Sequence, residues 1–350
     1  MSRQPMILKA LSEARGVSGN EQEVRAIIRD AICDVVDEVK TDTIGNLLAI
    51  KRGTAPDPLR VMISAHMDEV GLMTLGHNND GLLEVRSVGG LDPRVLPGSI
   101  WEVGPDRLPG VIGIKPIHLL KNGESEKVAD IEDLFVDIGA TSKSEAQKLA
   151  PVGTTITFAT QYRELGPTVS GKAFDDRAGC AVLVELLRAI APLASEIHAA
   201  FTVQEEVGLR GARVAAYAIQ PECAFALEGT IADDLPKDKK DVSPTTELGK
   251  GPAITVMDRS FIADRRLLAL VRDTASELEI PHQIKQPGVG GTDSGAIHMS
   301  REGVPSITLS VPCRYIHSPV ALLNLSDFEN TVRLLQESVM RLSRDTLRRE

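Results

Sequence analysis

Residues 61–65 form an almost unbroken apolar run, Val-Met-Ile-Ser-Ala, which leads directly into His66. A strand with one face in water alternates apolar and polar residues, whereas a strand buried on both faces is apolar throughout. Similar runs occur at residues 197–203, 223–227 and 304–311, and segments with helical apolar spacing lie between them. The pattern predicts an α/β protein whose sheet is largely parallel and covered by helices.

The residue composition and the length of the predicted elements change between residues 72 and 167. Glycine recurs there, the strand-like segments are short, and only residues 144–150 suit a short helix. Short strands separated by glycine- and proline-rich turns are typical of small barrels. We therefore expect a small β-barrel-like domain, residues 72–167, inserted into an α/β domain formed by residues 1–71 and 168–350.

The start of the chain predicts an amphipathic helix. Residues 18–21 read Ser-Gly-Asn-Glu, which is the pattern of a capping box. Apolar residues follow at helical spacing between residues 24 and 35. We expect this helix to pack against the rest of the domain.

Charge and composition exclude several classes of partner. The formal net charge is −10, which argues against binding to nucleic acid or to an anionic membrane surface. Aromatic residues make up 3% of the chain, too few for a platform on which bases could stack. The most apolar helical segment, residues 180–194, contains charges and a proline, so we expect no membrane span.

The cysteines and the first residues bear on the compartment. Cys33, Cys180, Cys223 and Cys313 lie far apart in apolar or strand-like surroundings, without a CxxC pair. We expect buried free thiols rather than disulfides or a zinc knot. No signal-peptide pattern is visible in residues 1–10. Together these features favour the reducing cytoplasm.

Two adjacent acids follow one of the apolar runs. Glu205 and Glu206 come directly after Phe-Thr-Val-Gln, and Gly208 follows them. Two neighbouring carboxylates at the end of a buried strand are costly, because each loses water and each repels the other. Either a cation holds them, or they simply begin a solvated loop. Adjacent strand residues point to opposite faces, so both acids can reach one site only if the strand ends there.

Other acids and imidazoles stand where predicted strands end or helices begin. They are His66, Asp68, Asp175, Asp176, Glu228 and His317. In an open α/β sheet, ligands bind outside the carboxyl ends of the strands. Two imidazoles and three carboxylates suit two metal ions that share one bridging carboxylate, with a bridging hydroxide balancing the charge. Alternatively, each histidine is an ordinary satisfied polar residue, and the Asp175–Asp176 pair caps a helix.

The motifs around these residues resemble those of a known family. In chain order they are HMDEVG at 66–71, LDPRV at 91–95, GKAFDDR at 171–177, QEEVG at 204–208, GTDSGAIH at 291–298 and RYIHSP at 314–319. Their order resembles that of the TET-type metallo-aminopeptidases, metallopeptidase family forty-two, which includes glutamyl and deblocking aminopeptidases. The resemblance covers nearly the whole chain.

The resemblance implies a fold and an assembly. The fold would be a phosphorylase/hydrolase-like α/β catalytic domain that carries the metals, with the inserted β-barrel mediating dimerisation. Dimers would assemble into tetrahedral dodecamers. The activity would be removal of N-terminal residues from short peptides by a metal-bridged hydroxide.

The resemblance also implies a role for each site residue. His66 and Glu228 would complete one metal site and Glu206 and His317 the other, with Asp175 rather than Asp176 as the bridge. Glu205 would be the general base, which takes a proton from the bridging water and passes it to the leaving amine. Asp68 would orient His66. The two divalent ions would be zinc or cobalt, and carboxylate and imidazole ligands also accept manganese.

One residue departs from the family's pattern. Glu228 stands where these aminopeptidases usually have aspartate, and its extra methylene moves the carboxylate outward by roughly 1.5 Å. Related dinuclear deacylases and carboxypeptidases use glutamate at this place. A deacylase or carboxypeptidase on the same scaffold, or a non-catalytic assembly protein, is therefore an alternative. The preferred first residue of the substrate is left open by the sequence.

Overall fold

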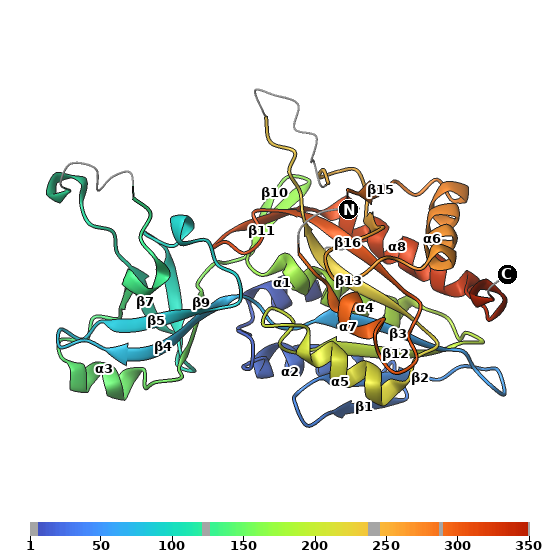
Figure 1. Cartoon of the computed structure of the whole chain (residues 1–350), viewed down its shortest axis with the longest axis horizontal. Helices are drawn as coiled ribbons and strands as arrows, with labels where there is room; N and C mark the ends of the chain where they lie inside the picture. Colours follow the sequence, from blue (N-terminus) through green and yellow to red (C-terminus); the bar gives the residue numbers. More distant parts are fainter. Residues whose placement is uncertain (1–5, 121–126, 237–245, 287–289, 349–350) are drawn as a thin grey trace.

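The computed structural model describes residues 6–120, 127–236, 246–286 and 290–348. It has two parts, an α/β body built on one large sheet and a closed barrel set to one side of it (Figure 1). The α/β class and the barrel-like insertion are both confirmed. The barrel strands lie between Gly71 and Phe158, so the barrel begins one residue before the expected insertion of residues 72–167 and ends inside it.

The large sheet has four parallel strands at its centre. In sheet order the strands are β1 (Glu38–Thr41), β2 (Leu47–Lys51), β12 (Glu196–Thr202), β3 (Arg60–His66), β13 (Cys223–Ile231), β16 (Ser306–Arg314), β17 (Ala321–Asn324), β11 (Thr168–Gly171) and β10 (Arg163–Leu165). Pairing is parallel from β12 through β3 and β13 to β16, and antiparallel between the other neighbours in this order. Two short strands, β14 (Ala253–Thr255) and β15 (Gln283–Lys285), extend the sheet beside β16. The carboxyl ends of the four parallel strands therefore meet at one edge.

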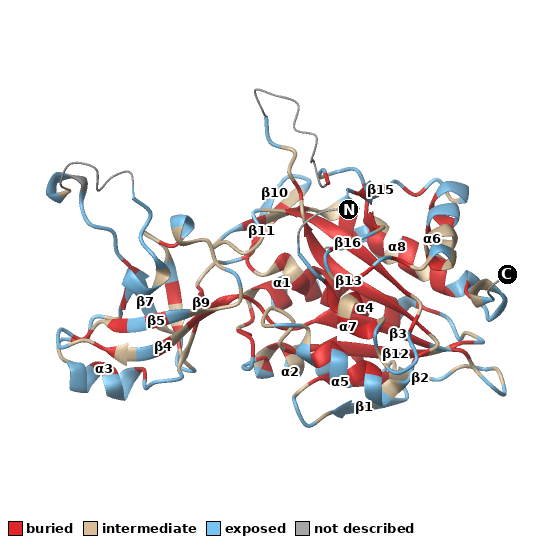
Figure 2. Ribbon diagram, viewed as in Figure 1, coloured by how far each residue is buried: buried red, intermediate tan, exposed pale blue. Residues whose placement is uncertain are grey.

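Helices cover both faces of this sheet. One face packs against α1 (Met6–Glu13), α2 (Gln22–Ile32), α4 (Phe174–Ala189) and α8 (Leu325–Arg341), with α6 (Arg265–Glu277) beside α8. The other packs against α5 (Arg210–Ile219) and α7 (Asp293–Ile297). Alternate residues of β3 pack on opposite faces of the sheet. Val61 and Ile63 lie in the core on the side of α4, and Met62 lies in the core on the side of α5. Figure 2 shows the central strands buried, as their continuous apolar sequence predicts.

The barrel closes in the order β4 (Gly71–His77), β5 (Leu83–Val88), β8 (Phe135–Asp137), β7 (Leu108–Ile112), β6 (Ile100–Val103) and β9 (Thr155–Phe158). Trp101 fills its core and stacks on Phe158 at 4.1 Å between ring centroids. The short helix α3 (Lys143–Leu149) covers β4. The barrel thus has a core of its own, separate from that of the α/β body.

Two local predictions are wrong. Ser18 does not cap the helix that follows it, because its hydroxyl donates to the carboxylate of Asp68 at 2.6 Å, and α2 begins without a side-chain cap. Cys33 is exposed at the end of α2, whereas the three other cysteines are buried, and all four are free thiols. In the part of the chain that the structure describes, no helix is both long and apolar enough to cross a membrane.

Candidate metal centre

The acids and imidazoles singled out by the sequence lie together at the carboxyl edge of the parallel strands. His66 ends β3, and Glu228 lies inside β13 rather than after it. Asp175 stands at the start of α4, where its backbone is not helical, and His317 lies in the turn between β16 and β17. Gly229 makes room for this convergence, since a Cβ there would come within 2.7 Å of the Asp175 backbone. The site thus draws on segments far apart in the sequence.

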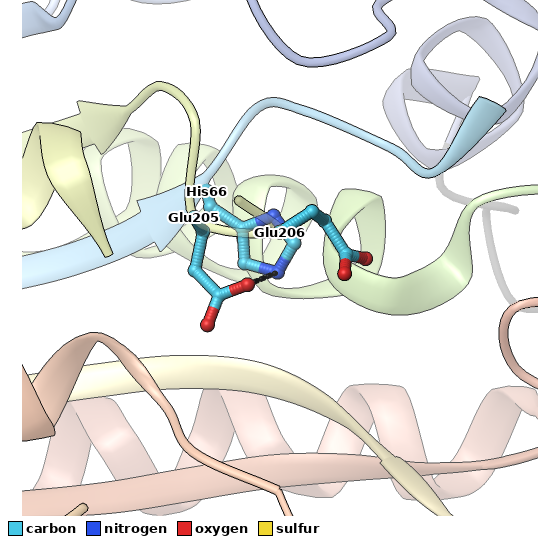
Figure 3. Close-up of side chains that lie close together, drawn as sticks. All are labelled: His66, Glu205 and Glu206. Carbon is cyan, nitrogen blue, oxygen red and sulfur yellow. Dashed lines mark ion pairs between the residues drawn. The ribbon is translucent and has the colours of Figure 1, made fainter. Parts of the chain in front are cut away.

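The two adjacent glutamates both reach the site because the strand before them ends. β12 stops at Thr202, and Gln204 has a φ of 57°, which breaks the alternation of a strand. Their side chains are 11% and 6% exposed, so the alternative of a solvated loop is wrong. The carboxylates lie on either side of the His66 ring (Figure 3), with Glu205 Oε2 3.8 Å from His66 Nε2.

The carboxylate of Asp68 holds this turn in place. Its Oδ1 accepts the backbone N–H of Glu205 at 2.9 Å, and its Oδ2 accepts that of Glu206 at 3.1 Å. The Nδ1 atom of His66 lies 3.1 Å from the backbone carbonyl of Asp68 and 3.6 Å from its carboxylate. Asp68 therefore positions both glutamates through its side chain, while its main chain makes the shorter contact with His66.

Asp175 and Asp176 are aimed in different directions. Asp175 Oδ1 lies 3.4 Å from Nε2 of His66, and its Oδ2 lies 3.5 Å from Nε2 of His317. Asp176 instead accepts backbone N–H groups from His66 and from Gly179, three residues further along α4. The capping alternative therefore holds for Asp176, whereas the carboxylate of Asp175 stands between the two imidazoles.

Glu228 and Glu206 flank this central carboxylate. Glu228 Oε2 lies 3.5 Å from Nε2 of His66, and Glu206 Oε1 lies 3.1 Å from Nε2 of His317. The other oxygen of Glu228 accepts the backbone N–H of Asp293 at 3.1 Å. The longer side chain of Glu228 thus still faces the imidazole. Sequence reasoning missed the contribution of Asp293, although the GTDSGAIH motif that contains it was visible.

Electrostatics show an excess of negative charge at this edge. Burial alone would lower the pKa of His66, but the charge of Glu205 and the contact with Asp175 raise it well above its usual value. Burial and neighbouring carboxylates raise the pKa of Glu205 well above its usual value, and burial raises that of Glu228 to about 7. The pKa of Asp175 is shifted the other way, because both imidazoles hold it well below the usual range despite burial. Such a cluster favours cations.

The donor set fits divalent metal ions. Asp175 Oδ1 and Glu206 Oε1 are buried and accept no hydrogen bond, which leaves their lone pairs free for coordination. Three groups of side chains could each hold an ion, because within a group every residue offers one ligand atom and these atoms all lie within 4.8 Å of one another. They are His66 with Glu205 and Glu206, His66 with Asp176 and Glu228, and Asp175 with Glu206 and His317. Imidazole and carboxylate are ligands for zinc, cobalt and manganese alike.

The cluster opens into a cavity of about 640 Å³. Its walls include the side chains of the candidate metal centre, several glycines and Lys285, the last residue of β15. Sequence reasoning did not single out Lys285, since a lone lysine in a short strand carries no motif. The cavity has room for a small organic substrate next to the cluster.

Comparison with known proteins agrees with this geometry. The M42 glutamyl aminopeptidase family model matches residues 45–334. A lysyl aminopeptidase of Pyrococcus furiosus is 38% identical over 338 residues, which cover 94% of each chain.

Two solved structures are similar over nearly the whole chain. A TET aminopeptidase from a marine sediment archaeon, Thaumarchaeota archaeon SCGC AB-539-E09, has a TM-score of 0.92 at 38% identity, covering 98% of this chain and 99% of that one. The TET1 peptidase of Pyrococcus horikoshii has a TM-score of 0.84 at 36% identity, covering 96% and 99%. The resemblance seen in the motifs is thereby confirmed, and the chain belongs to the M42 glutamyl aminopeptidase family.

Proposed function

We propose that the protein is an aminopeptidase that uses two divalent metal ions to remove N-terminal residues from short peptides. The observation that carries this proposal is the carboxylate of Asp175, with one oxygen toward each imidazole. His66 and Glu228 would hold one ion, Glu206 and His317 the other, and Asp175 would bridge them. When bound, two such ions polarise the scissile carbonyl and lower the pKa of a water molecule.

Glu205 is the proton carrier in this proposal. Its side chain lines the cavity, and its carboxylate lies 3.8 Å from His66 Nε2, further than the carboxylates of Asp175 and Glu228. Burial raises its pKa, as a group that accepts and returns protons near neutral pH requires. The carboxylate takes a proton from the attacking water and delivers it to the nitrogen of the leaving amine. Asp68 acts by positioning, because it fixes the backbone on which Glu205 stands.

We also propose that the protein is a cytoplasmic homo-oligomer that dimerises through the barrel and forms a tetrahedral dodecamer. The Pyrococcus horikoshii TET1 peptidase assembles into a tetrahedron or a large octahedral shell. On the barrel of this chain, Ile100 is 61% exposed and Val111 is 44% exposed, which supports a contact there. Sedimentation velocity on the purified protein tests the assembly, and a monomer at micromolar concentration would contradict it.

The experiment that tests the activity compares free and N-acetylated peptides. The protein is stripped with a chelator, reloaded with zinc, cobalt or manganese in turn, and its metal content is measured by elemental analysis. We expect about two ions per chain and cleavage of the free peptides alone. Cleavage of only the acetylated set would indicate a deacylase, release of the last residue a carboxypeptidase, and no turnover with any metal a non-catalytic assembly protein.

A further inference from the structure

The wall of the catalytic cavity contains one strongly basic side chain. Among the described residues that line the cavity, Lys285 alone carries an ammonium or guanidinium group. It ends β15, which pairs with β14 at the side of the large sheet, away from the strands that supply the metal ligands. Its charge is therefore separate from the cluster of carboxylates and imidazoles.

Lys285 is not an ordinary surface lysine. It is 7% exposed, and in the described parts of the chain its Nζ atom has neither a hydrogen bond nor an ion pair. Lysines that serve the structure differ: Lys172 donates to Ala14 and to Glu69, and Lys51 donates to two backbone carbonyls. An ammonium kept from bulk water without a partner is costly. The cost is offset when a ligand brings a negative charge.

The cavity leaves space for such a ligand. Gly208, Gly229, Gly290 and Gly291 contribute no side chains to its walls. The substrate's first side chain can therefore extend from the metal cluster into this space. The family and its relatives are named for substrates of opposite charge, glutamyl and lysyl. The charge that this chain prefers on the first residue of the substrate must therefore be inferred from the residues that line its own cavity.

We propose, building on the aminopeptidase function above, that Lys285 binds the side-chain carboxylate of the peptide's first residue. The enzyme therefore prefers peptides that begin with glutamate or aspartate. A charge-assisted hydrogen bond from Nζ to the carboxylate supplies the selectivity. A first residue with an ammonium or guanidinium group is disfavoured, because it would meet Lys285 as a like charge in a partly desolvated space.

The test measures kcat/KM of the metal-loaded enzyme for the p-nitroanilides of glutamate, aspartate, leucine and lysine. We expect the acidic pair to be the best substrates of the wild type. Lys285→Met should lower the glutamate-to-leucine ratio by about 10- to 100-fold, the range for one charged hydrogen bond. Lys285→Arg should retain most of the ratio, and Lys285→Glu should favour the lysine substrate. Lys250→Met, at an exposed lysine outside the cavity, is the matched control and should leave the ratio unchanged.

Two kinds of failure are distinguishable. No turnover of any anilide by the loaded enzyme would contradict the aminopeptidase function itself. Turnover without an acidic preference, or a ratio that Lys285→Met leaves unchanged, would overturn the role of Lys285 and leave the function standing. Because each ratio is measured within one variant, a loss of folded protein in that variant does not affect it.

Discussion

Removing the charge of Glu69 should destabilise the protein strongly. Glu69 lies beneath the site and is almost fully buried between two cations, with Lys172 Nζ 2.7 Å from both of its oxygens and Arg177 Nη2 3.2 Å from Oε1. Its Oε1 also accepts the backbone N–H of Gly16. Glu69→Gln would leave both cations buried without the carboxylate charge, and only neutral acceptors would remain, namely backbone carbonyls and the new amide oxygen.

The magnitude follows from the burial of the group. Breaking a buried ion pair by removing one partner costs about 3–5 kcal/mol. Each kcal/mol moves the unfolding midpoint by roughly 2 °C in a chain of this size, so Glu69→Gln should lower it by about 6–10 °C. Scanning calorimetry of the metal-loaded protein measures this. Glu185→Gln, which breaks the half-exposed pair with Arg188, is the matched control and should cause little change.

A second variant separates charge from packing. Lys172→Met combined with Glu69→Gln leaves one uncompensated cation instead of two, so the double variant should be less destabilised than the sum of the single ones. If Glu69→Gln shifted the midpoint no more than Glu185→Gln does, the two cations would not depend on Glu69. The reasoning from burial would then be refuted.

Three further predictions concern the site, the thiols and the contact between the barrel and the α/β body. The Glu205→Gln variant should keep both metals and lose most turnover, whereas Glu206→Gln should lower the metal content. Near-wild-type turnover of the metal-loaded Glu205→Gln variant would exclude Glu205 as the general base. A thiol reagent at pH 8 should modify Cys33 rapidly and the three buried cysteines only after denaturation, because burial raises their pKa; rapid modification of all four thiols in the native protein would contradict this. Despite partial burial, two arginines lower the pKa of Glu23, so its stabilising effect is present above about pH 4.5 and is lost as the pH falls through its folded-state value. The difference in unfolding midpoint between wild type and Glu23→Gln should therefore shrink on acidification, and a difference independent of pH would contradict the pairing.

Much of the fold could be predicted because burial leaves a local trace in the sequence. The continuous apolar run before His66 indicates a strand covered on both faces, and β3 is such a strand. Short glycine-rich segments indicate a barrel for the same local reason. By contrast, the first helix, α1, and the antiparallel partners of β16 carry no comparable signal. Their placement depends on contacts between distant segments.

The candidate site could be predicted as a set of residues but not as an arrangement. Residue type and position after a strand point to His66, Glu206 and Glu228 without coordinates. No local pattern shows that Ser18 bonds to Asp68, since the same four residues also match a capping box. The segment that contains Lys285 also carries no motif, and only the folded chain places this lysine in the cavity wall.

The sequence by itself determined the class of the fold, the family and the residue types at the candidate metal centre, because hydrophobic periodicity and ligand chemistry are properties of the residues. The tertiary structure alone decided how those residues are aimed. Asp175 rather than Asp176 stands between the imidazoles, because backbone amides of His66 and Gly179 occupy the second carboxylate. A side chain's direction depends on backbone conformation and on partners more than a hundred residues away, and these exist only after the chain has folded.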